Sequence, residues 1–504
     1  MWKIDLTKLV DELTYHVESP MIFSTGLFLF LFLAFSAIYL LLRHRTSARL
    51  FFVVLFSYYF YYKSSGTYFF LLGVVTCADF FLAARMHRAV KDVHRRLLLA
   101  CSLLVNLGLL CYFKYTNFFY EMLAPLWGGE FHPLDIFLPV GISFFTFQSL
   151  SYTIDVYRRQ IEPLHSLLDY AFYVSFFPQL VAGPIVRARD FIPQIRRPLL
   201  VTSEMFGRGV FLIVSGLFKK AVISDYISVN FVERIFENPS LYSGVENLFG
   251  VYGYALQIYC DFSGYSDMAI GLALLLGFHF PVNFNSPYKS LSVTEFWRRW
   301  HISLSSWLRD YLYISLGGNR KGTWRTYVNL FLTMLLGGLW HGASWNFVVW
   351  GALHGMVLAV HKFWSRTFLP AMGFEAEDVR KFFSRFPLMV CRIVPWLLTF
   401  HFVCFCWIFF RNATFDASLT MLEQIFTHFQ PELLPQLVGG YTEVFALMGI
   451  GYLLHFLPDS WERWCERGVI RLPLWLQAVL IAAVVYLVIQ VKSSDIQPFI
   501  YFQF

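Results

Sequence analysis

The sequence predicts an all-α integral membrane protein that crosses the bilayer many times. Of its 504 residues, 57% are hydrophobic and only 14% are charged, whereas soluble domains average about 25% charged residues. Apolar runs close to the ~20 residues that a spanning helix needs recur from one end of the chain to the other. No polar stretch is long enough for a separate soluble domain, so we expect residues 21–504 to form one multi-pass membrane domain.

Net charge and cysteine usage exclude other classes of protein. The net charge of +7 gathers in short loops, which is typical of cytoplasmic loops and not of a nucleic-acid surface. Seven of the eight cysteines lie in apolar runs, which favours buried thiols over a disulfide framework. Zinc-type spacings, a Walker loop, a dinucleotide fingerprint and a Gly-x-Ser-x-Gly elbow are all missing, so no metal site and no bound cofactor are predicted.

The N-terminal residues 1–20 alternate apolar with charged side chains. This pattern predicts a short surface helix, an extension ahead of Met21. A cleavable signal peptide is not expected, because these residues are polar and the first apolar run, at about residues 22–42, is long enough to span.

The first five predicted spans lie at about residues 22–42, 50–62, 68–84, 97–112 and 137–156. Counting crossings places three arginine-rich loops, at residues 43–49, 85–96 and 158–159, on one side, and an acidic loop at residues 121–135 on the other. The positive-inside rule makes the basic side cytoplasmic and the N-terminus extracytoplasmic. With later runs at about 206–223, 248–276, 328–339, 347–360, 390–410, 444–456 and 474–491, we expect about eleven transmembrane helices.

The middle of the chain is less regular. Residues 168–185 are apolar but broken by Pro178, Gly183 and Pro184, which favours a re-entrant segment walled by other helices. The run at 248–276 carries two carboxylates, Asp261 and Asp267, and should line a wet or protein-lined cavity. Because these aspartates are six positions apart, structural pairing with an arginine or a backbone amide is favoured over catalysis.

Residues 292–295 fit a capping box and predict a helix that continues to about Ser315. Its apolar face carries Val293, Trp297, Trp300, His301, Leu304, Leu308 and Tyr311, and its polar face carries Glu295, Arg298, Arg299, Ser306, Arg309 and Asp310. This pattern indicates an amphipathic interfacial helix. The loop at 289–325 holds seven basic and two acidic residues, and this net charge of +5 suits a cytoplasmic position and an anionic donor such as a phosphate-bearing cofactor.

His341 is the strongest candidate for chemistry. It ends a long apolar run and is flanked by Gly337, Gly338 and Gly342. Ionisable groups at such depth are costly and usually functional, and an imidazole titrates near neutral pH, so it could take a proton from an alcohol that attacks a thioester. The alternatives are a hydrogen-bonded packing histidine or a glycine helix-packing site. His301, on an apolar helix face, could equally be a packing residue.

Six segments together resemble the membrane-bound O-acyltransferase (MBOAT) superfamily, and within it the bacterial alginate O-acetyltransferase-like branch. They are residues 138–148 with Tyr152, Asp155 and Tyr157, then 177–185, 261–267, 295–304, 338–342 and 499–504. The resemblance implies a ring of helices around a central tunnel, with a core at residues 136–365. It also implies that His341 is the principal catalytic residue and His301 the second.

These observations together predict a membrane O-acetyltransferase that moves acetyl groups from a cytoplasmic donor, acetyl-CoA, to an extracytoplasmic, alginate-like polysaccharide. His341 would act as general base or transient acyl acceptor, and His301 would position the donor or stabilise the oxyanion. Residues expected to line the tunnel or support the site are Trp300, Trp340, Ser344, Asn346, Gln148, Asp261, Ser263, Asp267, Arg309 and Asp310. The expected location is the bacterial inner membrane, with a periplasmic acetyltransferase or polysaccharide-export proteins as partners.

Other functions remain open from the sequence. Within the same class, the acceptor could be peptidoglycan, or the reaction could be D-alanyl transfer to teichoic acid from a carrier protein. From another class, the chain could be a polytopic transporter, which an internal inverted repeat would favour. No such repeat is evident in the sequence.

Overall fold

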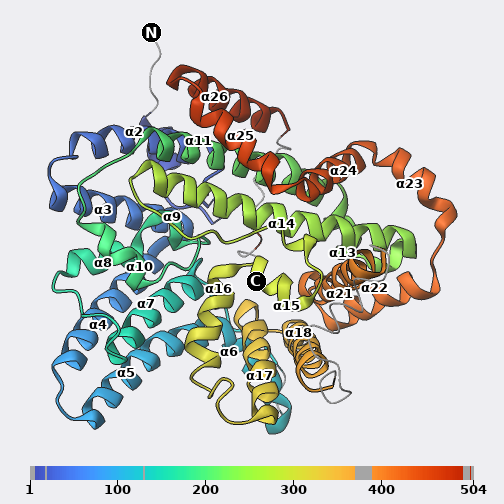
Figure 1. Ribbon diagram of the computed structural model, residues 1–504, viewed down its shortest axis with the longest axis horizontal. Coiled ribbons are helices and arrows are strands. Elements are labelled where there is room, and N and C mark those ends of the chain that lie inside the picture. Colours follow the sequence, from blue (N-terminus) through green and yellow to red (C-terminus); the bar gives the residue numbers. More distant parts are fainter. Residues whose placement is uncertain (1–5, 18–19, 129–130, 369–388, 492–499, 501–504) are drawn as a thin grey trace. The chain divides into compact units, whose positions relative to one another are not determined.

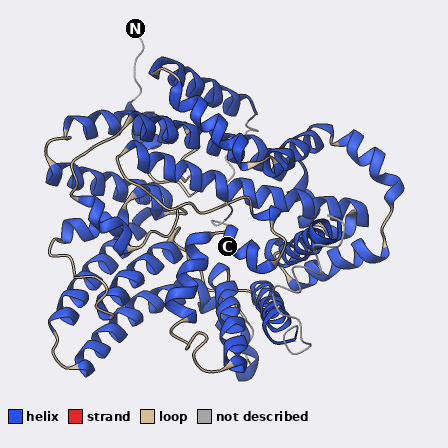
Figure 2. Ribbon diagram, viewed as in Figure 1, coloured by secondary structure: helices blue, strands red, loops and turns tan. Residues whose placement is uncertain are grey.

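The computed structural model describes residues 6–17, 20–128, 131–368, 389–491 and 500, and every regular element within these ranges is a helix (Figure 2). The predicted all-α class is therefore confirmed. Contacts divide the chain into two compact units, Met1–Phe218 with Gly264–Pro281 and Cys465–Gln503, and Lys219–Ser263 with Val282–Trp464. Figure 1 follows the element order along the chain.

The first unit holds the N-terminal helices and the last helix. They are α1 (Leu6–Leu13), α2 (Gly26–Leu41), α3 (Thr46–Ser65), α4 (Phe69–Arg88), α5 (Asp92–Leu110), α6 (Thr116–Leu123), α7 (Ile142–Tyr157), α8 (Leu167–Ser175), α9 (Phe177–Leu180), α10 (Ala188–Ile195), α11 (Ser203–Leu217) and α26 (Leu474–Val491). The predicted short helix in the N-terminal extension corresponds to α1.

The second unit holds the helices around the two candidate histidines. They are α12 (Asp225–Ile227), α13 (Glu233–Glu237), α15 (Val293–Arg299), α16 (Ile302–Trp307), α17 (Thr323–His341), α18 (Trp345–Phe363), α21 (Val394–Arg411), α22 (Phe415–Thr427), α23 (Leu434–Gly440) and α24 (Thr442–Phe456). Two helices, α14 (Gly244–Leu275) and α25 (Asp459–Arg471), contribute residues to both units.

Short π- and 3₁₀-helical turns interrupt or extend these helices. The π-helical turns are η2 (Cys111–Tyr115), η4 (Phe218–Ser224), η5 (Ser228–Val232), η8 (Leu308–Tyr313), η9 (Trp364–Phe368) and η10 (Met389–Ile393). The 3₁₀ turns are η1 (Gly66–Tyr68), η3 (Ala124–Trp127), η6 (Pro239–Leu241), η7 (Pro287–Lys289) and η11 (Pro431–Leu433). Turns of the π type inside α-helices are rare and are frequent near functional sites.

Apolar helices of membrane length are present. Three helical stretches of the described residues are long and apolar enough to cross a membrane, namely Thr46–Arg88, Asp92–Leu126 and Cys391–Arg411. Helices at Pro431–Gly440 and Thr442–Phe456 would make a fourth together, with a bend of 97° between them. These helices agree with the predicted membrane class, whereas the total of about eleven spans stays a prediction.

The broken segment predicted at residues 168–185 is broken in the structure. Helix α8 ends at Ser175, α9 covers only Phe177–Leu180, and residues 172–188 are all buried. Around α9, Phe177 packs against the rings of Phe35 and Phe56, with centroids 5.5 and 5.1 Å away. The irregular backbone is therefore surrounded by protein within its unit, as such backbone must be at membrane depth.

A buried carboxylate ties together α4, α5 and α7 in the first unit. Asp79 of α4 accepts hydrogen bonds from Ser102 at 2.6 Å, Asn106 at 2.7 Å and Ser149 at 2.5 Å, and its side chain is fully buried. Tyr170 of α8 lies 2.8 Å from the Ser149 hydroxyl. Three donors on two neighbouring helices thus depend on one acceptor.

Replacing Asp79 with leucine should strongly destabilise the first unit. The change leaves three buried donors without their acceptor, and each such loss costs about 1–3 kcal/mol. We expect a large fall in the thermal unfolding midpoint of the detergent-solubilised protein. Asp92→Asn is the matched control, because the Asp92 side chain is 78% exposed. Equal midpoints for the two variants would contradict this role of Asp79.

Candidate active site

His341 is the last residue of α17, and it is buried, with 3% of its surface exposed. Two glycines let α17 and α18 approach until their backbones touch. A Cβ atom on Gly338 would lie 2.4 Å from the Phe347 carbonyl oxygen, and one on Gly351 would lie 2.6 Å from the Met334 carbonyl oxygen. The glycines beside His341 therefore serve helix packing, and this packing sets where the imidazole lies.

Aromatic rings surround the His341 imidazole. Its ring centroid lies 4.9 Å from that of Trp340, 5.2 Å from Trp350 and 5.2 Å from Phe410, all at steep angles. Edge-to-face contacts of this kind hold a ring in a defined orientation. His341 is therefore enclosed by α17, α18 and α21.

His301 lies at a break that the sequence did not predict. The expected continuous helix from residue 293 to about 315 is wrong, because α15 ends at Arg299 and α16 begins at Ile302. His301 adopts a left-handed conformation, with φ of 43° and ψ of 57°. This conformation is unfavourable for a non-glycine residue, and such residues cluster at functional sites. No proline or glycine between residues 293 and 316 marks the break in the sequence.

The loop that precedes α15 runs alongside this break and bonds to it. Ile302 donates its backbone N–H to the Asn283 carbonyl oxygen at 2.9 Å, and Asn285 donates to the Arg299 carbonyl oxygen at 2.9 Å. These bonds occupy backbone groups that the interrupted helix leaves without intrahelical partners. The break is therefore held by a tertiary contact.

Both candidate histidines contact the same tryptophan. The Trp340 ring centroid lies 4.9 Å from His341 and 6.3 Å from His301, and His301 is fully buried. The edge of Phe262 packs on His301 at 4.6 Å. The structure thus brings the two predicted histidines into one aromatic cluster in the second unit, with the Trp340 indole touching each of them.

Trp300 and Asn346, two further predicted site residues, stabilise the packing around the histidines. Trp300 stacks on Phe296 at 5.6 Å and contacts Trp407 at 5.0 Å. Asn346 of α18 donates to the Asn412 carbonyl oxygen at 2.7 Å, just beyond α21.

Ser344 is the N-cap residue of α18, and its side chain makes no capping hydrogen bond within that helix. The role predicted for Ser344 in the site stays a prediction.

Asp261 pairs with a lysine. Lys220, which is buried, places its ammonium 2.5 Å from Asp261 and 2.7 Å from Asp225. The expected structural pairing is therefore found, although the partner is not the predicted arginine or backbone amide. Lys220 lies in the π-helical turn η4.

The other predicted residues belong to both units. Ser263 is buried on α14 in the second unit, while Asp267 and Gln148 belong to the first unit. Gln148 donates to the Tyr173 carbonyl oxygen at 2.6 Å, which is a structural contact. Arg309 and Asp310 pair with each other at 2.6 Å on the surface.

Sequence reasoning missed two polar contacts near the histidines. Asn283 lies 3.2 Å from the Nδ1 atom of His301. His354 accepts a hydrogen bond at Nδ1 from the Trp297 indole at 3.2 Å and is fully buried. Neither contact leaves a local signal, because each joins residues far apart in the chain.

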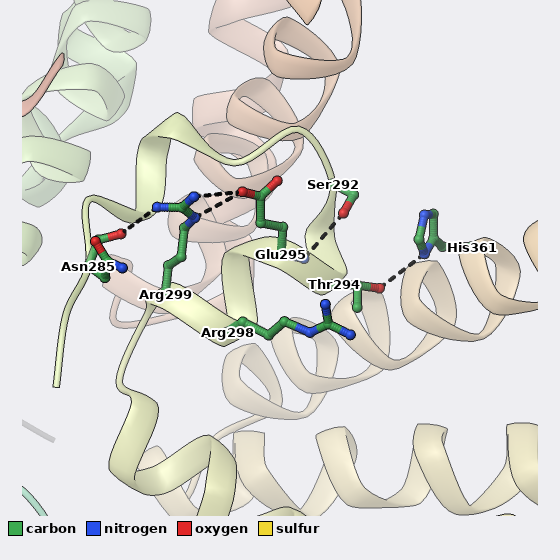
Figure 3. A pocket seen from close by; sticks show the side chains of 7 residues that line it. All are labelled: Asn285, Ser292, Thr294, Glu295, Arg298, Arg299 and His361. Atoms are coloured by element: carbon green, nitrogen blue, oxygen red, sulfur yellow. Dashed lines mark hydrogen bonds and ion pairs between the residues drawn. The ribbon is translucent and has the colours of Figure 1, made fainter. Parts of the chain in front are cut away.

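A polar pocket of about 570 Å³ lies against α15 (Figure 3). Its lining residues are Asn285, Ser292, Thr294, Glu295, Arg298, Arg299 and His361. Within it, Arg299 pairs with Glu295 at 2.9 Å, and Thr294 lies 3.0 Å from Nδ1 of His361. The predicted capping bond is present, since the Ser292 hydroxyl accepts from the Glu295 amide at 3.2 Å.

Arg298 also lines this pocket, and among the described residues no carboxylate forms an ion pair with it, whereas Arg299 is paired with Glu295. Two other basic residues of the predicted loop are paired, Lys289 with Asp459 at 2.8 Å and Arg309 with Asp310. The Lys289 hydrogen bond holds the pKa of Asp459 below its ordinary value. The pocket can therefore hold an anionic group beside the Arg298 guanidinium.

The pocket and the histidine cluster occupy opposite faces of the same short helix. Arg298 of α15 lines the pocket, while Trp297 packs on Trp350 at 5.6 Å, and Trp350 contacts His341. A helix with its side chains is only about 10–12 Å across. Helix α15 therefore connects a polar recess with the buried histidines.

Comparison with known proteins assigns these features to a family. The MBOAT, membrane-bound O-acyltransferase family model matches residues 123–415, a range that includes both histidines and the pocket. The probable alginate O-acetylase of Pseudomonas aeruginosa is 41% identical over 415 residues, which are 81% of this chain and 75% of that protein.

Relatives with other acceptors are also similar. The peptidoglycan O-acetyltransferase of Helicobacter pylori is 38% identical over 371 residues, covering 68% of this chain and 67% of that protein. The teichoic acid D-alanyltransferase of Bacillus subtilis is 28% identical over 319 residues, covering 58% and 75%. The similarity thus extends to proteins named for different polymers.

Substituting Gly338 should disrupt the hairpin that carries His341. In Gly338→Ala the new methyl group meets backbone atoms, which cannot move aside as a flexible side chain can, so α17 and α18 must separate. We expect a lower unfolding midpoint and less monodisperse protein in size-exclusion chromatography. The matched control is Gly439→Ala, where nothing lies within 4 Å of the new atom. Unchanged behaviour of Gly338→Ala would contradict the close packing.

Proposed function

Because this chain belongs to the membrane-bound O-acyltransferase family and is an acyltransferase, we propose that it moves acetyl groups from a cytoplasmic thioester donor to an extracytoplasmic polysaccharide. Relatives named as alginate O-acetylases support acetyl as the transferred group, at about 40% identity over 81% of the chain. The observation that carries the proposal is the pair of buried histidines on the Trp340 indole.

The proposed reaction needs one base and one electrophile. His341 takes the proton from the acceptor hydroxyl while that oxygen attacks the thioester carbonyl carbon. The tetrahedral intermediate then collapses, the carbon–sulfur bond breaks, and the thiolate leaves and receives the proton from the His341 imidazolium. Enclosure of His341 by Trp340, Trp350 and Phe410 excludes bulk water, which limits hydrolysis of the thioester.

A membrane location of the histidines would explain why an integral membrane protein performs this chemistry. If only the acyl group reaches the histidines, the charged remainder of the donor never enters hydrocarbon, where each charge is costly. We propose a location in the bacterial inner membrane, with the N-terminus outside and a periplasmic acetyltransferase or export proteins as partners. The acceptor is an alginate-like polysaccharide, and peptidoglycan is the second candidate because a peptidoglycan O-acetyltransferase is 38% identical.

The histidines provide the first test. His341→Ala should lower acetyl transfer to the polymer by about 10²–10⁴-fold, the usual contribution of a general base, while the protein stays monodisperse in detergent. His401→Gln is the control, because that exposed histidine of α21 bonds to Tyr252 at 2.9 Å and touches neither candidate histidine. Acetylation can be measured by mass spectrometry of the polymer. Retained transfer in His341→Ala would refute the proposal and favour a transporter.

The pocket provides a second test, which concerns the donor. We propose that Arg298 binds the phosphate groups of acetyl-CoA, so that the thioester end can reach the histidine cluster past α15. Arg298→Ala should raise the KM for acetyl-CoA about tenfold, the effect of losing roughly 1.4 kcal/mol of charge-assisted hydrogen bonding, and should leave kcat nearly unchanged. The uncharged donor acetyl-pantetheine should show no such effect.

Arg320→Ala is the matched control for the pocket, because Arg320 is an exposed arginine of the same basic loop that does not line the pocket. Its KM for acetyl-CoA should stay near that of the unaltered protein. An equal rise for both donors in Arg298→Ala, or an equal effect of the two arginine variants, would refute phosphate binding at the pocket. The His341 result would be unaffected by that outcome.

A further inference from the structure

Asn283 contacts three consecutive residues at the break between α15 and α16. Its side-chain oxygen accepts from the Ser303 amide at 3.1 Å and from the Ser303 hydroxyl at 2.8 Å, and it lies 3.2 Å from Nδ1 of His301. Its backbone carbonyl accepts from the Ile302 amide at 2.9 Å. Asn283 is 1% exposed, so these contacts form away from solvent.

The Ser303 amide identifies the protonated nitrogen of His301. A backbone N–H can only donate, so the Asn283 atom that receives it must be the amide oxygen and not the nitrogen. That oxygen can only accept, so the His301 Nδ1 atom beside it must carry the hydrogen. In the neutral imidazole the other nitrogen, Nε2, then holds the lone pair.

The same contacts hold the backbone of His301 in its unfavourable conformation. A left-handed non-glycine residue costs on the order of 1–3 kcal/mol and persists only where its surroundings determine it. Asn283 supplies bonds to the residue itself and to the two that follow. The aromatic rings of Phe262, Phe284 and Trp340 pack against the imidazole at 4.6, 6.4 and 6.3 Å. Backbone and ring are thus both restrained.

We propose that Asn283 is a positioning residue that fixes His301 as the Nδ1–H tautomer, so that Nε2 acts as a hydrogen-bond acceptor or base toward the substrate. This inference rests on the acyl transfer proposed above. It distinguishes between the two roles predicted for His301, which are positioning the donor and stabilising the oxyanion. Stabilising an oxyanion requires an N–H donor at Nε2, which the neutral Nδ1–H tautomer lacks. Accepting a hydrogen bond from an amide N–H group of the donor requires the lone pair that this tautomer has.

Two substitutions at Asn283 test the proposal. Asn283→Leu keeps the size but removes the acceptor, and kcat should fall at least about tenfold because the ring is no longer held in one tautomer. Asn283→Asp keeps an acceptor and should recover most of kcat. Its carboxylate favours the imidazolium, so the acid limb of the kcat/KM pH profile should move upward by about one unit.

His341, as the proposed base, also contributes to the acid limb, but it is unaltered in every Asn283 variant, so a change between variants reports on His301. The rings from α14, from the loop at Phe284 and from α17 carry no charge, and the titratable group beyond Trp340 is His341. Asn247→Leu is the matched control. Asn247 is a fully buried asparagine of α14 that donates to the carbonyls of residues 239, 242 and 243. This control should lower the unfolding midpoint without moving the acid limb.

The protonation of His301 can also be measured without any activity assay. This measurement can show that the inference about Asn283 is wrong even if the proposed acyl transfer is right, and the reverse. In protein with ¹⁵N-labelled histidine, the His301 signals, identified by their loss in His301→Gln, should show a protonated Nδ1 and an unprotonated Nε2. Asn283→Leu should alter that pattern. A protonated Nε2 in the neutral unaltered protein, or an Asn283→Asp variant as slow as Asn283→Leu with an unmoved acid limb, would overturn the proposal.

Discussion

The close approach of α17 and α18 is the constraint on which the candidate site depends. Gly338 and Gly351 bring the two backbones into contact, where side chains would otherwise keep them apart. As a result the end of α17 lies directly against α18, and Trp340 and His341 enter a cluster of aromatic rings. Without this contact, the rings of Trp350 and Phe410 could not enclose the imidazole at about 5 Å.

One buried carboxylate in the first unit and one buried lysine in the second are paired with neighbouring side chains. In the first unit, Asp79 collects three neutral donors, and in the second, Lys220 lies between Asp225 and Asp261. Such pairing is required because an unpaired polar group in an apolar interior costs several kilocalories per mole. The carboxylates of Asp79 and Asp261 are therefore explained by structural pairing.

Helix α15 separates two environments with different roles. One face carries charge and lines the polar pocket, and the other carries Trp297, which packs on Trp350, a neighbour of His341. The acetyl-CoA donor proposed above would use this combination, because its phosphates require ionic partners while its thioester requires exclusion of water. The break at His301, immediately after α15, turns the chain so that the imidazole is buried.

The sequence alone determined the helical class, the family and the amphipathic character of α15, and it singled out His341 and His301 as candidates, since each depends on local periodicity or on short motifs. Only the tertiary structure decided the break at His301, the Asn283 contact that holds it, and the pairing of Lys220 with Asp261. These features join residues that are 18 to 41 positions apart. Periodicity indicates which side chains share a face of one helix. A hydrogen bond from a loop that is distant in the sequence can outweigh the backbone preference of a single residue such as His301. No local sequence pattern predicts such a contact.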